Sequence, residues 1–77
     1  MFLSVEYKGY SPDLDDLIRR CAEIGKAGCD GSGFLFGTGT RDLTIGVKNE
    51  RQAEHVAGIL KSNLPRGVKV TYYSLVD

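Results

Sequence analysis

The stretch CDGSGFLFGTGTRDLTIG, which runs from Cys29 to Gly46, holds five of the chain's ten glycines. Glycine-rich loops cradle phosphate when they follow a strand and open a helix, because the amides at the helix start then face the anion. Here the glycines follow a predicted helix and lead into a predicted strand, and no GK[ST] sequence ends the stretch. We therefore interpret it as a β-hairpin and not as a nucleotide-binding loop.

Few other side chains suggest catalysis or metal binding. His55 is the only histidine; it avoids the apolar stripe of its predicted helix and has no evident nucleophile or metal partner. Cys21 and Cys29 are too few for a disulfide framework and too far apart for a CxxC redox or zinc pair. We expect Cys21 to be buried and Cys29 to lie in a loop. The sequence thus predicts a protein without catalysis, cofactor or metal.

Charged residues cluster at two predicted loop ends. Asp13, Asp15 and Asp16 open the first predicted helix, where carboxylates complement the positive end of the helix dipole. A calcium-binding loop would need another spacing and a terminal glutamate. Arg41 and Asp42 are adjacent at the predicted hairpin turn, where exposed charges can act as specificity contacts or form ordinary surface.

The first two elements are predicted from periodicity and capping. Side chains alternate between apolar and polar over Phe2–Tyr7, which is typical of a strand with one buried face. Ser11 can cap the helix that follows, with Pro12 at its first position. Gly25 or Gly28 ends this helix, because glycine accepts the left-handed conformation of a C-cap. The apolar stripe of the helix comprises Leu14, Leu17, Ile18, Cys21 and Ile24.

The segment GFLFGTGTRDLTIGV predicts two antiparallel strands joined by a two-residue type II′ turn at residues 39–40. Opposed residues of such a hairpin share a face of the sheet. In this register Phe36 opposes Leu43. Phe34 opposes Ile45, so both phenylalanines are expected to point toward the core.

The same register predicts the residues of the opposite, open face. The expected pairs there are Gly33 with Gly46, Leu35 with Thr44, and Gly37 with Asp42. This half of the face would be nearly bare of side chains. Glycine within a strand often marks a bulge or the close approach of another backbone, and both interpretations stay open. The predicted protein-binding surface comprises Gly33, Leu35, Gly37, Arg41, Thr44, Gly46 and Tyr73.

A second helix and a last strand complete the chain. Asn49 can cap this helix, with Gln52 in capping-box position, and VKVTYYSLV alternates as a strand. The order β-α-β-β-α-β with right-handed crossovers puts both helices on one face of a four-stranded antiparallel sheet. The expected fold is a ferredoxin-like α+β sandwich with the first and third strands central. Residues 1–77 are expected to form a single domain.

Charge and hydropathy limit the classes of partner. Ten basic and ten acidic residues cancel, whereas a domain that binds a phosphate backbone usually has a basic excess. No apolar run approaches the roughly 18 residues of a membrane span. The start MFLSVEYKGY has no basic leader or long apolar stretch, so we expect a cytoplasmic protein without a membrane partner.

The expected function is the binding of a protein through the open sheet face or an edge strand. The partner is either a second copy of the chain or a larger assembly that the chain regulates or inhibits. Two alternatives stay open. One is weak nucleic-acid binding, and the other is the sensing of a small molecule at a dimer interface. The residues expected to carry the nucleic-acid alternative are Lys8, Lys48, Lys69 and Tyr73.

Overall fold

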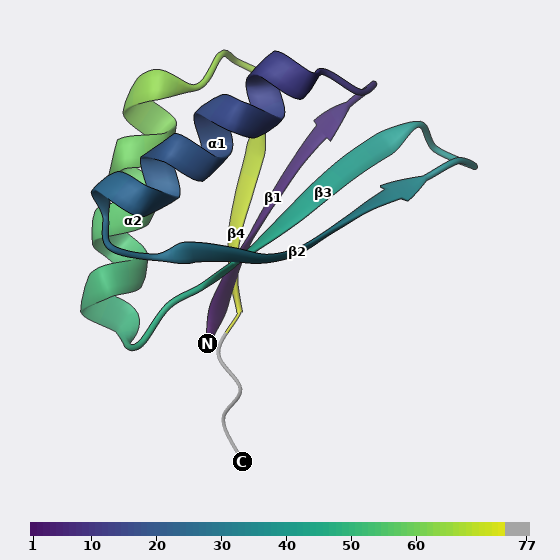
Figure 1. The fold of residues 1–77 in the computed structure, drawn as a ribbon. Coiled ribbons are helices and arrows are strands. Elements are labelled where there is room, and N and C mark those ends of the chain that lie inside the picture. Colours follow the sequence, from purple (N-terminus) through teal and green to yellow (C-terminus); the bar gives the residue numbers. More distant parts are fainter. Residues whose placement is uncertain (74–77) are drawn as a thin grey trace.

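The computed structural model describes residues 1–73, whose strands and helices are drawn in Figure 1. The elements are β1 Phe2–Lys8, α1 Pro12–Ile24, β2 Gly28–Leu35, β3 Thr40–Gly46, α2 Glu50–Asn63 and β4 Lys69–Tyr73. All neighbouring strands are antiparallel, and the order β2-β3-β1-β4 places β1 and β3 in the centre. Both helices cover the same face of the sheet (Figure 1). The predicted α+β fold is confirmed; the end of the predicted last strand lies outside the described residues.

The core lies between the two central strands and the helices. Leu3, Val5 and Tyr7 of β1 are buried, as their alternation predicted, and Leu43 and Ile45 of β3 are fully buried. The edge strands β2 and β4 add only partly buried side chains to this core. The helices contribute Ile18, Cys21, Ala22, Ala53, Val56 and Leu60.

Both helices begin at the predicted caps. Ser11 Oγ accepts a hydrogen bond from the Leu14 amide at 3.2 Å, and Asn49 Oδ1 accepts one from the Gln52 amide at 2.8 Å. The Gln52 side chain reaches back past the cap and accepts a hydrogen bond from the amide of Lys48, the residue before Asn49, at 2.7 Å. Ser11 and Asn49 satisfy amide groups that the first turn of a helix leaves without partners.

The end of α1 differs from the prediction in two ways. Ile24 was expected on the apolar stripe but is 67% exposed, because the helix ends there and Cys21 and Ala22 already fill its buried side. Gly25 follows as the cap with φ −83°, so the cap needs no left-handed glycine. The residue that adopts the left-handed conformation is Lys26, at φ 60°.

Gly25 instead allows the end of α1 to approach α2 closely. A Cβ atom at this position would lie 2.5 Å from Cγ2 of Val56, which is fully buried in α2. Valine is restricted in χ1, so its side chain has little freedom to move away. A side chain at Gly25 would therefore push the two helices apart.

We expect Gly25→Ala to lower the free energy of unfolding by about 1–3 kcal/mol, as overpacking of a well-packed interior does. Gly58→Ala is the matched control, because Gly58 lies within α2 and a Cβ there would meet nothing within 4 Å. This control should stabilise the protein by roughly 0.5–1 kcal/mol. Urea unfolding of both variants measures the difference, and equal shifts in the same direction would contradict the close approach.

The hairpin has another register than the predicted one. Leu35 pairs with Thr40 and Phe34 pairs with Arg41, so a four-residue loop over residues 36–39 replaces the two-residue turn. The predicted pairing of the phenylalanines with β3 is wrong. Phe34 still shares its sheet face with the inward side chains of β3, whereas Phe36 lies in the loop and is 91% exposed.

The register is set at the other end of β2. Only three residues separate α1 from β2, so the chain begins to pair with β3 at Gly28. Cys29, expected in a loop, lies opposite Ile45 and packs partly against the core. Pairing along the whole of β3 gives its outer backbone groups partners, which a strand starting later would not. The register shifts by one residue between Cys29 and Gly31, which leaves Asp30 without a partner in β3; Gly33 and Gly46, the glycines for which a bulge was considered, pair in the regular ladder.

Candidate functional site

The structure brings together three polar side chains from different elements. Asp15 of α1 is only 2% exposed, and its carboxylate accepts hydrogen bonds from β1 and β3. Tyr7 Oη donates to Asp15 Oδ1 at 2.5 Å. Arg41 donates to Asp15 Oδ2 from Nη2 at 2.8 Å and from Nε at 3.1 Å. This Tyr7–Asp15–Arg41 cluster ties the loop end of the hairpin to α1.

The contacts within the cluster favour an ionised Asp15 and a protonated Tyr7. Burial alone would raise the pKa of Asp15, but the hydrogen bonds from Arg41 and then Tyr7 outweigh it and leave the pKa below its ordinary value. Burial raises the pKa of Tyr7, and its hydrogen bond to Asp15 raises it further. A buried carboxylate with a lowered pKa and bound lone pairs is a poor general base. These shifts favour a structural role for the cluster over a role as a general base.

Two sequence interpretations are corrected by this cluster. Arg41 was expected to be exposed at the turn, but its side chain is only 13% exposed and its residue lies within β3. Asp15 was explained by the helix dipole alone. Helical spacing from Asp15 to Ile18 and Ala22 was the signal that could have placed this carboxylate on the buried face.

Next to the cluster, three aromatic side chains form an exposed patch, which we call the aromatic tip: Tyr10, Phe34 and Phe36. The rings of Phe34 and Phe36 meet edge to face, with centroids 5.1 Å apart. Tyr10 stacks with the guanidinium of Arg41, whose Cζ lies 5.1 Å from the ring centroid. These four side chains line one shallow hollow, in which Phe36 is 91% and Tyr10 62% exposed.

Hydrogen bonds from Gly9 and Arg41 hold the aromatic tip in place. The amide of Gly9 donates to the carbonyl of Gly39 at 2.8 Å, which joins the end of β1 to the hairpin loop. Both glycines have positive φ, at 81° and 66°, a conformation that other residues rarely adopt. Arg41 Nη1 also donates to the carbonyl of Gly33 at 3.3 Å. The loop that carries Phe36 is thus anchored at Gly39, and the strand that leads into it is held at Gly33.

The half of the open sheet face that was predicted to be nearly bare of side chains is covered by two carboxylates. Gly33 lies opposite Asp42, and a Cβ at Gly33 would be 2.9 Å from Asp42 Oδ1. A Cβ at Gly46 would overlap the carboxylate of Asp30, and Gly46 pairs with Gly28 on β2. The expected pairs on this face are therefore wrong. The two glycines give carboxylates of the same chain room to lie over the strands.

The remaining predicted binding residues lie at two ends of the sheet. Leu35, 61% exposed, and Gly37 lie at the hairpin loop beside the aromatic tip. Gly46 and Tyr73 both lie opposite Phe2, at the far end of the strands. Tyr73 stacks on the Phe2 ring with centroids 5.0 Å apart. The structure thus unites only part of the predicted surface, with Thr44 in β3 between the two ends.

The residues expected to bind nucleic acid are also dispersed. Lys8 and Lys69 line one hollow together with the acidic Glu6. Lys48 lies elsewhere, in a hollow at the start of α2 that also includes the exposed His55. The four residues named for this alternative therefore do not form one patch.

No protein-family model, curated protein or solved structure matches this chain. Within residues 1–73, no helix is long and apolar enough to cross a membrane. The same part of the chain places no three His, Cys, Asp or Glu side chains where they could hold a metal ion together.

Proposed function

We propose that this chain is a small, non-enzymatic binding module that docks onto a protein partner through the aromatic tip. The observation that carries the proposal is the exposure of Phe36, whose ring is held against Phe34 while 91% of the residue faces solvent. Aromatic residues are enriched in the buried centres of protein interfaces, where a few of them supply most of the binding energy. A partner with an apolar cavity would remove this ring from water.

The rigidity of the tip supports the same proposal. The loop is anchored through Gly9 and Gly39, and Arg41 is fixed by its ion pair with Asp15. A surface that is already ordered loses less conformational entropy when it binds. The hollow between Tyr10 and Phe36 can accept one apolar side chain of the partner in return.

The other surfaces suggested by the sequence receive less support. The open face carries the carboxylates of Asp30 and Asp42 over its glycines, which hinders the close approach of another backbone. The β2 edge is interrupted by a bulge, and bulges disrupt the pairing of an edge strand with a further strand. The proposal therefore moves the binding surface from the sheet face to the end of the hairpin.

Affinity capture from the native cell tests this proposal. The variant Phe36→Ser should fold as the wild type does and lose the captured protein partner, because it removes the exposed ring only. Ile24→Ser is the matched control, since Ile24 is also a large exposed apolar residue but lies at the end of α1. Capture of the same proteins by wild type and Phe36→Ser would refute docking through the tip.

A further inference from the structure

Within residues 1–73, the outer edge of β4 is a regular sheet edge to which no further strand is paired. In the described sheet β4 pairs only with β1, and the register from Lys69 to Tyr73 runs without a shift. Edge strands in native proteins are commonly blunted by a bulge, a proline or several charges. The other edge, β2, has such a bulge, whereas β4 has one lysine and no proline.

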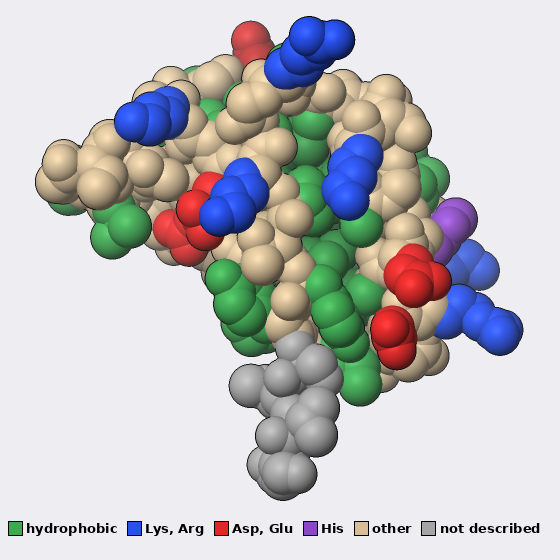
Figure 2. Space-filling view, turned by 180° about the vertical axis from the view of Figure 1, so that it is seen from behind, with side chains coloured by type: hydrophobic (Ala, Val, Ile, Leu, Met, Phe, Trp, Pro, Cys, Tyr) green, Lys and Arg blue, Asp and Glu red, His purple; other side chains and the backbone are tan. Residues whose placement is uncertain are grey.

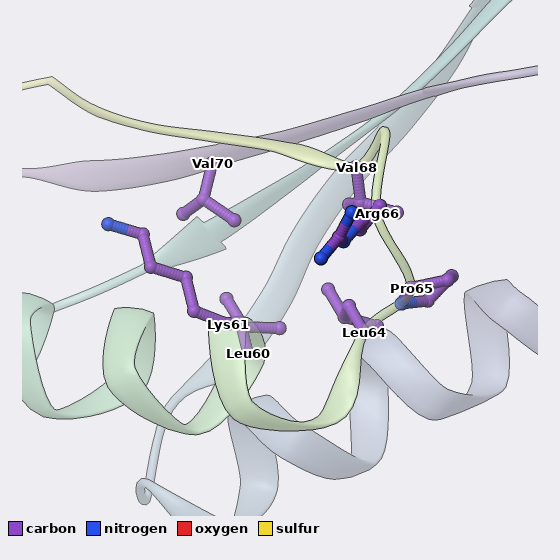
Figure 3. A pocket seen from close by; sticks show the side chains of 7 residues that line it. All are labelled: Leu60, Lys61, Leu64, Pro65, Arg66, Val68 and Val70. Atoms are coloured by element: carbon purple, nitrogen blue, oxygen red, sulfur yellow. The ribbon is translucent and has the colours of Figure 1, made fainter.

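An apolar groove runs beside this edge, between β4 and α2. Seen from behind the view of Figure 1, hydrophobic side chains form a strip along it, with a basic side chain beside its upper part and acidic ones beside its lower part (Figure 2). Figure 3 shows one end of the groove, where Lys61 extends from α2 toward Val70. The apolar lining at this end is Leu60, Leu64, Pro65, Val68 and Val70, and at the other end Leu3, Ala53, Ala57 and Tyr72; the charged Glu50, Glu54, Lys61 and Arg66 line it as well.

We propose that a second copy of the chain covers this edge, with the two β4 strands paired antiparallel about a two-fold axis at Thr71. The four strands of each copy then form one continuous eight-stranded sheet. A two-fold interface brings the same surface of both copies together, so the surface must complement itself. The charges and side chains along β4 and α2 meet this condition.

Two kinds of cross-strand pair in this register belong to classes that stabilise sheets, and none joins like charges. On the helix side, Val70 lies opposite Tyr72 of the second copy, a pair of β-branched and aromatic side chains. At the axis, Thr71 meets Thr71. On the open side, Lys69 lies opposite Tyr73 of the second copy. Tyr72, 38% exposed in one copy, would be covered in the dimer.

The helices complement one another in the same arrangement. Because α2 contacts both β1 and β4, and neighbouring strands are about 4.8 Å apart, the two α2 helices would be separated by about 10 Å. Packed helices lie roughly 8–10 Å apart. The side of α2 that faces the second copy is a stripe at helical spacing, formed by Glu50, Glu54, Ala57 and Lys61.

The two α2 helices run antiparallel in the dimer, so this stripe meets itself in reverse order. The small Ala57 then lies at the axis. Glu54 faces Lys61 of the second copy, and the pair occurs twice. Both side chains are exposed, and neither forms an ion pair within the part of the chain that the structure describes. In the aromatic tip, Phe34 and Phe36 lie on the β2–β3 hairpin and Tyr10 lies between β1 and α1. None of them lies on β4 or α2, so the tip stays free and the dimer is independent of the proposed function.

Charge reversal tests this dimer by sedimentation across a concentration series. The wild type should show a monomer–dimer equilibrium. Glu54→Lys and Lys61→Glu should each weaken the homodimer by on the order of 10-fold, because each replaces two attractive pairs with two repulsive ones. An equimolar mixture of the two variants should recover the dimer, since its two cross pairs again join a lysine and a glutamate.

The controls carry the same charge changes elsewhere. Glu23→Lys lies on α1 and Arg51→Glu on α2 outside the stripe, both exposed, and both should dimerise as the wild type does. A wild type that is monomeric at every concentration overturns the proposal. A dimer that the single reversals leave intact, or that the mixture does not restore, overturns it as well.

Discussion

Replacing Asp15 by alanine is expected to lower the free energy of unfolding by about 3–5 kcal/mol, the usual cost of removing one partner from a buried ion pair. Arg41, whose side chain is 13% exposed, would be left without its carboxylate, and Tyr7 would lose an acceptor. A domain of 77 residues has a total stability of about 4–12 kcal/mol. Urea unfolding followed by circular dichroism should therefore find that this variant has lost a large part of its stability at neutral pH.

The double variant Asp15→Leu with Arg41→Met separates the charge from the packing. Replacing both ions by apolar side chains leaves no unpaired charge, and such replacements are often neutral or stabilising. Tyr7 Oη keeps the Ser11 carbonyl, 3.0 Å away, as an acceptor. We expect the double variant to recover most of the stability lost by Asp15→Ala. If it is as unstable as that variant, the ion pair is not the cause of the loss.

The pH dependence of the free energy of unfolding is a second measurement of the contribution of this cluster. The pKa of Asp15 is lowered in the folded state, so its stabilising contribution is present above the ordinary carboxyl pKa and is lost as the pH falls through the lower, folded value. The wild type should lose stability below about pH 4 more steeply than the double variant. The raised pKa of Tyr7 acts at the alkaline end, where its contribution is lost as the pH rises through that raised value.

Most of the fold could be predicted from the sequence because its elements carry local signals. Alternation identified β1, the caps at Ser11 and Asn49 identified the helix starts, and the order of elements then left few topologies. The register of the hairpin carries no such signal. Glycines in β2 have no side chains whose burial would favour one pairing over another, so the short connection after α1 and the long β3 decide it.

The candidate site was less predictable because it depends on that register. A turn at residues 39–40 places Arg41 at the loop, whereas the observed pairing places it opposite Phe34 and beside Tyr7 of β1. Only then does its guanidinium reach Asp15, which is 26 positions away in the sequence. One local signal was present: Arg41 alternates in phase with Leu43, and a period of two puts both side chains on the face covered by helices.

The observed register also predicts a large contrast between two apolar residues of the hairpin. Leu43 is fully buried in β3, and Leu43→Ala should lower the free energy of unfolding by about 2–5 kcal/mol through lost burial and the cavity that remains. Phe36 is the larger side chain but is 91% exposed, so Phe36→Ala should change it by less than about 0.5 kcal/mol.

The two-residue turn makes the opposite prediction for Phe36. There its ring would lie against Leu43 in the core, and truncation to alanine would cost about 3–5 kcal/mol. Urea unfolding of the two variants therefore distinguishes the registers without a further structure. The same experiment decides how a loss of capture by Phe36→Ser is understood. If the ring contributes little to stability but is needed for capture, it contacts the partner directly. If the ring stabilises the core, the loss of capture is an effect on the fold.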